Sequence, residues 1–462
     1  MTAPAAAAGA ARSGPPALLW AEQAWVDGRW RESVLLEAGE DGCWAAVLPG
    51  TLPPPAAARL SGPALPGLVD AHSHAFQRAF AGLAESRSGA HDDFWSWRDR
   101  MYGVALAIST DGLRELATRL YRELLAGGYT HVCEFHYLHH ANDGQRHADP
   151  AAMSLALVEA AAAAGIGLTL LPVLYERAGF TAPALRPDQR RFASDVDFVL
   201  ALRDRVRAAG RAGAGAGAAG VPRAPRAGVA IHSLRAAAEP SIRALIGRLA
   251  GDEGPVHIHV AEQTGEVEDC LAATGARPIE WLARTGWLDA RWQLVHATHA
   301  EPREIEAVAR TGAGIVVCPT TEANLGDGVP DLPRWLAAGV PLSIGSDSQV
   351  CRSAAEELRW LDYAQRLVHR RRNVGADPAR YEGSTAARLF EACLAGGGRA
   401  AGFARWGLAP GAPADLLVLD TAAAGLQGVP DAHRLDAWVF ATDAATAAPA
   451  IAETWVAGRR VR

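Results

Sequence analysis

The feature that most constrains the fold of this chain is a series of eight short apolar runs, each of which ends in polar residues. Helix-like segments separate the runs, which lie at 64–74, 129–137, 166–176, 227–235, 255–262, 292–299, 312–322 and 341–348. Near-continuous apolar strands that alternate with helices are typical of a parallel sheet buried on both faces. Eight such units predict an α/β fold, a (β/α)8 barrel of the TIM type with functional residues at the carboxyl ends of its strands. An open doubly wound sheet is the alternative, but the sequence lacks the glycine-rich phosphate turn expected after its first strand.

Both ends of the chain have a different pattern. Residues 1–63 and 408–462 contain short alternating runs, which are typical of strands with one buried face. We therefore predict a small β-sandwich domain built from both chain ends, next to a barrel at 64–407. The length of 462 residues suits a barrel of about 250 residues or more plus a second domain. Within the barrel, an Ala-, Gly-, Pro- and Arg-rich stretch at about 208–228 predicts a surface loop.

Composition excludes several classes of protein. A formal net charge of -6 gives no reason to expect nucleic acid or an anionic membrane as a partner. The N-terminus lacks the pattern of a signal peptide, and no apolar run reaches the roughly 20 residues of a membrane span. The six cysteines are scattered without a CxxC pair, which favours reduced thiols and a cytoplasmic enzyme. The chain contains no lysine, so Schiff-base chemistry is excluded.

Histidines and one aspartate stand at four of the predicted strand ends. His72 and His74 are two residues apart, so the alternation of a strand places both imidazoles on the same side. His259 ends the fifth strand, His296 lies on the sixth, and Asp347 ends the eighth. An HxH pair alone is weak evidence, because structural histidines are as common, but the four strand ends together predict a metal site. Histidine nitrogens with one carboxylate suit Zn²⁺, with Fe²⁺ as the alternative.

This combination resembles the amidohydrolase superfamily, whose barrel opens with HxH and closes with an aspartate on strand eight. The resemblance covers most of the chain, including the split small domain. In binuclear members a carboxylated lysine bridges two metals, and this chain has none. The resemblance therefore implies one metal per chain, bound by His72, His74, His259 and Asp347.

Several stretches are similar to one branch of the superfamily, the formimidoylglutamate deiminases. These stretches are 72–78, 94–98, 134–140, 232–235 and 318–326. The resemblance implies hydrolysis of N-formimidoyl-L-glutamate to N-formyl-L-glutamate and ammonia in histidine degradation, by attack of a metal-bound hydroxide on the formimidoyl carbon. Asp347 would accept the proton of the attacking water, Glu262 would protonate the leaving nitrogen, and His296 would orient the hydroxide. An exposed loop glutamate and a structural core histidine are the alternatives for Glu262 and His296.

The expected substrate has one amidinium-like group and two carboxylates, so its pocket needs acceptors at one end and arginines at the other. Arg98 and Arg235 can hold carboxylates through bidentate hydrogen bonds, which lysine cannot mimic. Salt bridges on the barrel rim are the alternative for both arginines. The remaining expected substrate contacts are Gln77, Tyr137 and His232.

Two other functions are compatible with parts of this pattern. A mononuclear deaminase of a purine or pyrimidine such as guanine would share the metal ligands, but its pocket would be aromatic and neutral. A catalytically silent barrel that serves as a scaffold would tolerate the loss of ligands, and every expected position is filled. The resemblance also allows a homodimer. It leaves Arg78 and His139 without an assigned role.

Overall fold

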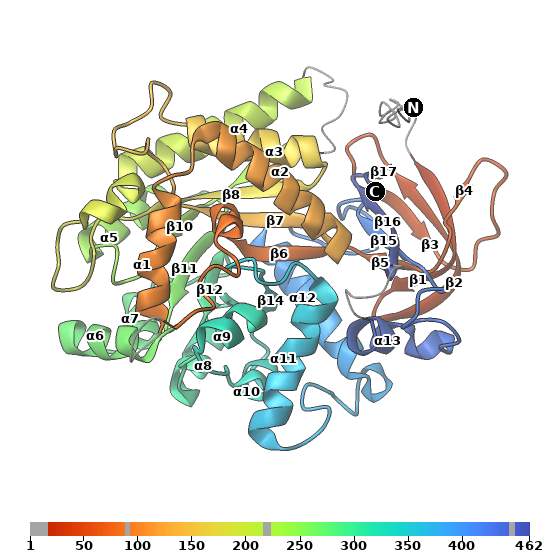
Figure 1. The fold of residues 1–462 in the computed structure, drawn as a ribbon. Coiled ribbons are helices and arrows are strands. Elements are labelled where there is room, and N and C mark those ends of the chain that lie inside the picture. The colour runs from red at the N-terminus through yellow and green to blue at the C-terminus, as the bar shows by residue number, and fades with distance from the viewer. Residues whose placement is uncertain (1–16, 88–92, 216–222, 443–448) are drawn as a thin grey trace.

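The computed structural model of the protein describes residues 17–87, 93–215, 223–442 and 449–462 (Figure 1). Eight parallel strands form the central sheet, each hydrogen-bonded to the next. In spatial order they are β6 (Leu68–Ser73), β7 (Tyr129–His136), β8 (Gly167–Leu174), β10 (Val229–Ile231), β11 (Val256–Val260), β12 (Trp292–His296), β13 (Gly314–Val317) and β14 (Leu342–Ile344). A two-residue strand, β9 (Arg226–Ala227), adds to β8.

The two edges of this sheet meet, which closes it into the predicted barrel. Ser73 and Asp347 form a parallel bridge, and the amide of Asp347 donates to the carbonyl of His72 over 2.9 Å. Gly345 lies at this seam, where a Cβ atom would come within 2.7 Å of the His72 Cβ. Only glycine allows such a close approach, so the sequence at the end of β14 is adapted to closure.

Helices surround the barrel (Figure 1). The α-helices are α1 (Phe94–Ala105), α2 (Thr110–Gly127), α3 (Ala152–Ala164), α4 (Val196–Gly215), α5 (Glu239–Arg248), α6 (Thr264–Thr274), α7 (Pro278–Thr285), α8 (Pro302–Ala309), α9 (Pro319–Leu325), α10 (Leu332–Ala337), α11 (Ala354–His369), α12 (Thr385–Ala400) and α13 (Arg434–Phe440). Short 3-10 helices are η1 (Ala75–Ala79), η2 (Pro187–Phe192), η3 (Tyr381–Gly383) and η4 (Asp431–His433).

Helix α2 illustrates why these segments are helical. The Ser109 hydroxyl accepts a hydrogen bond from the amide of Gly112 and so caps the first turn. Apolar side chains at helical spacing, among them Leu113, Leu120 and Leu124, are fully buried. Gly128 ends the helix with φ of 102°, a left-handed conformation that favours glycine.

The loop predicted at about 208–228 differs from the structure. Helix α4 continues to Gly215, because Arg207 anchors this part of the helix by pairing with Asp252 over 2.7 Å, and because the alanines among 208–215 offset the low helix propensity of its glycines. Residues 216–222 lie outside the described part of the chain, and Arg226–Ala227 forms β9. A low-complexity composition therefore did not exclude regular structure here.

The two chain ends form a second sheet. Its strands run in the order β17 (Arg459–Arg460), β16 (Ile451–Val456), β15 (Leu416–Leu419), β5 (Ala64–Pro66), β1 (Leu18–Val26), β2 (Arg29–Ala38) and β3 (Trp44–Leu48), and β4 (Ala58–Arg59) pairs with β1. An antiparallel bridge from Cys43 to Pro413 brings the β3 end back toward β15, so the sheet curls around an apolar core of its own. Ala64–Pro66, at the predicted start of the barrel, pairs with β15 and β1 in this sheet.

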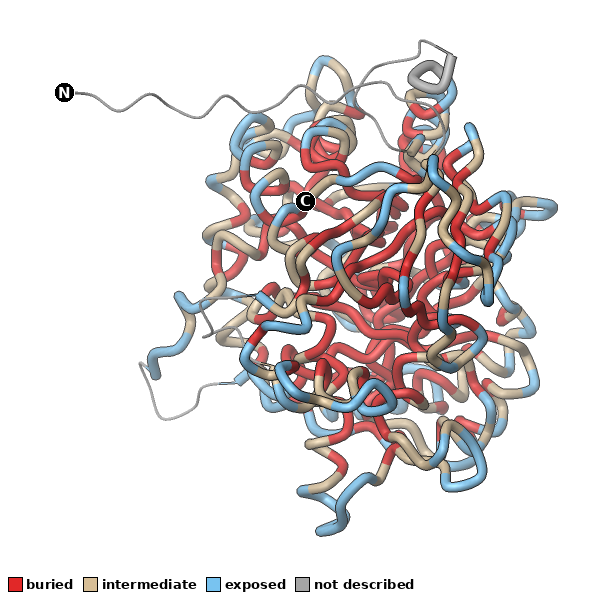
Figure 2. The backbone as a smooth tube through the Cα atoms, turned by 90° about the vertical axis from the view of Figure 1, so that its right-hand side faces the viewer, coloured by how far each residue is buried: buried red, intermediate tan, exposed pale blue. Residues whose placement is uncertain are grey.

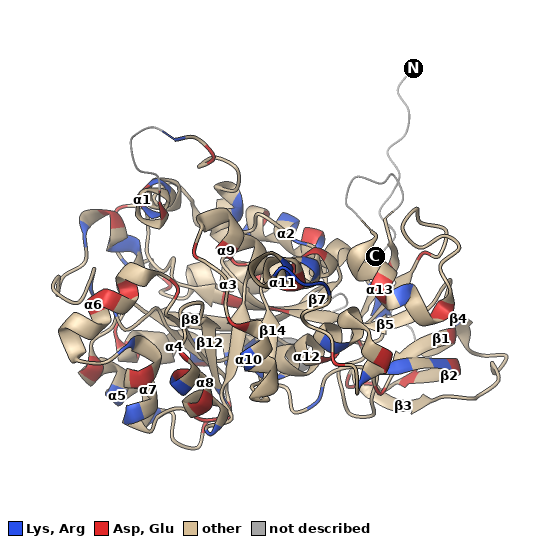
Figure 3. Ribbon diagram, turned by 90° about the horizontal axis from the view of Figure 1, so that it is seen from below, with Lys and Arg blue, Asp and Glu red and all other residues tan. Residues whose placement is uncertain are grey.

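Burial and charge follow this architecture. Buried segments run through the centre of both sheets, and exposed residues gather in the peripheral loops (Figure 2). Acidic and basic residues are interspersed over the helices in the view from below (Figure 3). Among the residues that the structure describes, no helix combines the length and the apolar character needed to cross a lipid bilayer.

Candidate active site

Three histidine rings converge at the carboxyl ends of β6 and β11. The Nε2 atom of His72 lies 3.1 Å from Nε2 of His74 and 3.0 Å from Nε2 of His259. The Asp347 Oδ1 atom lies 3.5 Å from Nε2 of His72 and 3.4 Å from Nε2 of His74. Nitrogen ligands about 2.0–2.1 Å from a tetrahedral zinc ion would lie roughly 3.3 Å apart. The arrangement is therefore that of ligands around one cation.

The ionisation of these rings also fits a cation. Burial lowers the pKa of His72 to about 3 and lowers the pKa values of His74 and His259. The rings are thus neutral near pH 7, and their lone pairs are available to a metal. His74 donates its Nδ1–H to the carbonyl of Phe135 over 2.9 Å, which leaves Nε2 as the ligand atom. The donor set could hold a divalent cation.

The backbone at this end of the barrel is strained at the functional positions. His296 has φ of 69° and Asp347 has φ of 48°, both in the left-handed region. Ala261, next to Glu262, has φ of 52°. Residues without the freedom of glycine adopt such angles only when the surrounding structure requires it, and they cluster at active sites. Each of these residues lies at the end of a barrel strand or within three residues after it, where the strained backbone turns the chain toward the cavity.

Acidic groups surround His296. Its Nε2 atom lies 3.5 Å from Glu262 Oε1 and 3.8 Å from Asp347 Oδ2, while its Nδ1–H donates to Glu322 Oε1 over 3.3 Å. Burial alone would lower the pKa of His296, but the neighbouring carboxylates outweigh it and raise the pKa to about 10. Burial raises the pKa of Glu262 to about 7, and the charge of Asp347 adds to this effect, while His296 opposes it. Glu262 can therefore take up and release a proton near neutral pH.

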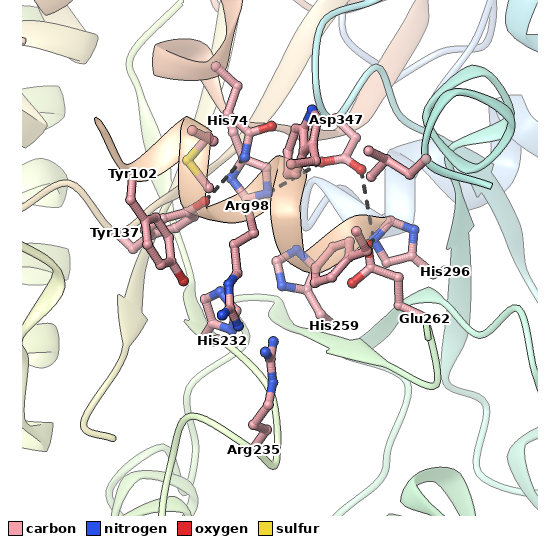
Figure 4. A pocket seen from close by; sticks show the side chains of 15 residues that line it. His74, Arg98, Tyr102, Tyr137, His232, Arg235, His259, Glu262, His296 and Asp347 are labelled. Carbon is pink, nitrogen blue, oxygen red and sulfur yellow. Dashed lines mark hydrogen bonds and ion pairs between the residues drawn. The ribbon is translucent and has the colours of Figure 1, made fainter. Parts of the chain in front are cut away.

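A cavity of about 440 Å³, which includes space open to solvent, adjoins the histidine cluster (Figure 4). It brings together every predicted site residue except His72, which lies beneath it against His74 and His259. The predicted residues that line it are His74, Gln77, Arg98, Tyr137, His232, Arg235, His259, Glu262, His296 and Asp347. Residues from η1, α1 and six barrel strands or their following turns thus meet in one place.

Two arginines form the cavity wall opposite Asp347 and His296. Arg98 comes from α1 and Arg235 from the turn after β10, and their guanidinium groups point toward each other (Figure 4). The Nε atoms of both are buried and have no hydrogen-bond partner among the described residues. Arg98 meets Asp99 over 3.3 Å, and Arg235 forms no ion pair within the described part of the chain. Buried cationic donors without partners are suited to an anionic ligand.

Neutral polar groups complete the wall. Gln77 donates from Nε2 to the Tyr137 hydroxyl over 3.2 Å, and its Oε1 atom lacks a partner among the described residues. The ring of His232 packs edge-on against Tyr175 with the centroids 4.3 Å apart. The neighbouring Ser233 hydroxyl lies 3.3 Å from His232 Nδ1, so the other ring nitrogen can face the cavity.

Several contributors were not predicted from the sequence. The cavity is also lined by Phe94, Trp97, Met101, Tyr102 and Leu325. Met101 and Tyr102 lie three and four residues after Arg98 on α1, a helical spacing that could have identified them. Glu322, which holds His296, lies in the stretch 318–326, but the sequence did not predict a role for it.

Arg78 and His139, which the sequence left unassigned, lie outside the cavity lining. Arg78 pairs with Glu123 through two hydrogen bonds of 2.9 and 3.2 Å. His139 is buried and hydrogen-bonds the carbonyl of Val173 over 3.1 Å. Both side chains are therefore hydrogen-bonded to other parts of the protein and do not line the cavity.

Comparison with known proteins places this geometry in context. The model of the amidohydrolase family matches residues 64–461. A formimidoylglutamate deiminase of Pseudomonas aeruginosa is 45% identical over 425 residues, which cover 92% of this chain and 90% of that protein. A crystal structure of an amidohydrolase from Brucella melitensis is 40% identical with a TM-score of 0.87, and the match covers 96% of this chain and 94% of that one. A 5-methylthioadenosine/S-adenosylhomocysteine deaminase of Haloarcula marismortui is more distant, at 26% identity over 77% of this chain and 72% of its own length.

Proposed function

The chain belongs to the amidohydrolase family, and from this premise we propose that it hydrolyses N-formimidoyl-L-glutamate to N-formyl-L-glutamate and ammonia. The reaction is a step of histidine degradation. The 45% identity to a formimidoylglutamate deiminase over nearly the whole chain supports this proposal. Relatives that deaminate nucleosides are more distant, which makes a purine or pyrimidine deaminase the weaker candidate.

The observation that carries the proposal is the pair of arginines across the cavity from the histidine cluster. Arg98 and Arg235 each have a buried Nε donor without a partner among the described residues. A substrate with two carboxylates would satisfy these donors through charge-assisted hydrogen bonds. Guanine or cytosine has no carboxylate and would leave the same donors unpaired, which is costly in a closed site.

We propose that one zinc ion per chain is held by His72, His74, His259 and Asp347, with Fe²⁺ as the alternative. When bound, such an ion lowers the pKa of a bound water toward about 7 and so supplies the nucleophile at neutral pH. The histidine Nε2 atoms lie within 3.1 Å of their neighbours, and burial keeps the rings neutral, both of which support the assignment. No lysine exists in the sequence to bridge a second metal.

The proton transfers follow from the positions of three side chains. Asp347 directs Oδ1 at the histidine ligands and Oδ2 at His296, so it can accept the proton of the attacking water on Oδ2. The water oxygen adds to the formimidoyl carbon, the bond from that carbon to the terminal nitrogen breaks, and Glu262 gives that nitrogen the proton with which it leaves as ammonia. His296 orients the attacking group, because its Nδ1–H is fixed by a carboxylate on α9.

Ammonia release by the purified protein tests the proposal. N-Formimidoyl-L-glutamate, guanine and cytosine would be supplied in parallel, with mass spectrometry of the organic product. We expect ammonia and N-formyl-L-glutamate from the first compound only. Release from guanine or cytosine, with none from formimidoylglutamate, would replace the proposal with a nucleobase deaminase.

Three expectations remain predictions. They are a division into a barrel at 64–407 and a domain from both chain ends, a cytoplasmic location, and a homodimer that binds neither nucleic acid nor membrane. Light scattering of the purified protein would establish the oligomeric state. Partial proteolysis would establish whether the chain ends form a separate unit.

A further inference from the structure

One indole ring contacts both arginines of the cavity. The guanidinium carbon of Arg98 lies 4.7 Å from the centroid of the Trp95 ring, and that of Arg235 lies 5.1 Å from the same ring. The face of an aromatic ring attracts a cation, because its quadrupole is negative there. Trp95 thus offsets the repulsion between two positive charges that have few other partners within the described structure.

Contacts on α1 and α6 hold Trp95 in place. Asp93 caps α1 by accepting from the amides of Trp95 and Ser96 over 3.0 Å each, which fixes the first turn of the helix. Arg98 follows three residues later, and helical spacing puts the two side chains on the same face. On α6, a Cβ atom at Gly265 would lie 3.7 Å from the indole, so the ring packs against this helix where no side chain intervenes.

A second cavity, called here the outer cavity, also borders the two arginines that contact Trp95. The outer cavity has a volume of about 850 Å³, which includes space open to solvent, and it is lined by Trp95, by the loop at 178–181 after β8, and by Asp269, Ala272 and Ala273 of α6. Arg98 and Arg235 line both this cavity and the inner one that holds the histidines. Each guanidinium group therefore has open space on two sides, and only one side leads to the reacting groups.

We propose that Trp95 is a positioning residue that fixes both arginines toward the inner cavity and thereby sets the preference for a dicarboxylate. The proposal rests on the proposed function, because it assigns the acid end of the substrate to these arginines. Without the indole, Arg235 loses its aromatic contact, and Arg98 keeps the Tyr102 ring at 5.5 Å and Asp99. The guanidinium groups can then turn into the outer cavity, where they cannot hold a substrate aligned with Glu262 and the histidine cluster. The effect belongs to substrate binding and leaves the proton transfers unchanged.

The test compares Trp95→Ala and Trp95→Phe with the unaltered enzyme on two substrates. N-Formimidoyl-L-glutamate has two carboxylates and N-formimidoylglycine has one. In Trp95→Ala we expect KM for the dicarboxylate to rise by about tenfold or more, with kcat within about threefold, since two cation–π contacts are lost. The rise in KM should be smaller for the monocarboxylate. Trp95→Phe keeps an aromatic ring and should therefore retain most of the substrate binding.

A matched control is available on the outer face of the barrel. The guanidinium of Arg243 stacks on Trp287 at 5.2 Å, and neither residue lines either cavity. Trp287→Ala should therefore leave KM and kcat unchanged. If Trp95→Ala raises KM equally for both substrates, or lowers kcat alone, then Trp95 has a merely structural role and the proposal is wrong.

A binding measurement separates this proposal from the proposed function. Calorimetry with N-formyl-L-glutamate reports on the acid end without turnover, and Trp95→Ala should weaken binding by about tenfold. If the unaltered protein releases no ammonia from formimidoylglutamate but shows this difference in binding, the positioning role stands and the proposed reaction fails. If both proteins bind the dicarboxylate equally well, the positioning role is wrong whatever the reaction is.

Discussion

The histidine end of the cavity stands on barrel strands, whereas the arginine end stands on α1 and on a turn beyond β10. His72, His74 and His259 are fixed by strands that are hydrogen-bonded on both sides, and their ring nitrogens lie about one ligand spacing apart. Arg98 and Arg235 are held by stacking on aromatic faces. The groups proposed to perform the reaction thus stand on hydrogen-bonded barrel strands, and the two arginines proposed to select the substrate stand at the periphery of the fold. Substitutions at the histidine end should stop the reaction with any substrate. Substitutions at the arginine end should weaken substrate binding to a degree that depends on the carboxylates of the substrate.

Removal of the metal should have the largest effect and should affect the histidine end alone. Dialysis against a chelator is expected to abolish ammonia release, and added Zn²⁺ should restore it. N-Formyl-L-glutamate should still bind the treated protein, because the arginines are untouched. Elemental analysis should find about one ion per chain, and two tightly bound ions would contradict the single ligand set.

The Glu262→Gln substitution should have the second-largest effect on activity. The amide keeps the volume of the side chain but cannot give up the proton, so kcat should fall by about 10²–10⁴ with the metal retained. Glu266→Gln, four residues further on in the first turn of α6, changes a buried carboxyl outside the cavity lining. The Glu266 Oε2 atom accepts from the amide of Glu262 over 3.1 Å, and the glutamine oxygen can keep this hydrogen bond, so this control should cost far less. Loss of the metal from Glu262→Gln would make this residue a ligand, and near-normal turnover would assign the proton transfer to another group such as His296.

Arg235→Lys tests the arginine end. The ammonium group is a point charge and loses the bidentate geometry, so KM for formimidoylglutamate should rise by roughly 10- to 100-fold while kcat changes little. The metal content should stay at the level of the unaltered protein. Arg243→Lys is the matched control, because Arg243 is exposed on α5 and pairs with Glu239. A normal kcat/KM for Arg235→Ala would show that this residue does not hold the substrate.

Glu322→Gln should have the smallest effect and should show whether the histidine end depends on its supporting groups. Glutamine can still accept from the His296 Nδ1–H, but it lacks the charge, so we expect kcat to fall by about tenfold or less. KM should not change, because Glu322 does not line the substrate cavity. A rise in KM with normal kcat would place Glu322 with the groups that select the substrate.

Much of the barrel and of the site could be predicted because the chemistry is local in the sequence. Each apolar run formed a strand, and the polar residues at the run ends, such as His72, Glu262 and Asp347, followed from the rule that barrel sites lie at carboxyl strand ends. The secondary structure of 208–215 could not be predicted in this way, because composition alone does not distinguish a loop from the continuation of a helix. The roles of Trp95 and Glu322 were missed for another reason, since Trp95 contacts Arg235 and Glu322 contacts His296, and both partners are remote in sequence.

The sequence by itself determined the (β/α)8 architecture, the residue types at the proposed metal site and the absence of a bridging lysine. These properties depend on periodicity, on spacing within one strand and on composition, all of which can be observed directly in the sequence. Only the tertiary structure decided that two arginines share one indole, that Glu322 holds His296, and that His296 and Asp347 adopt left-handed backbone angles. Contacts between distant segments and strained backbone angles arise from packing, because closure of the barrel fixes the distances between its strand ends and the surrounding contacts hold angles that isolated residues avoid.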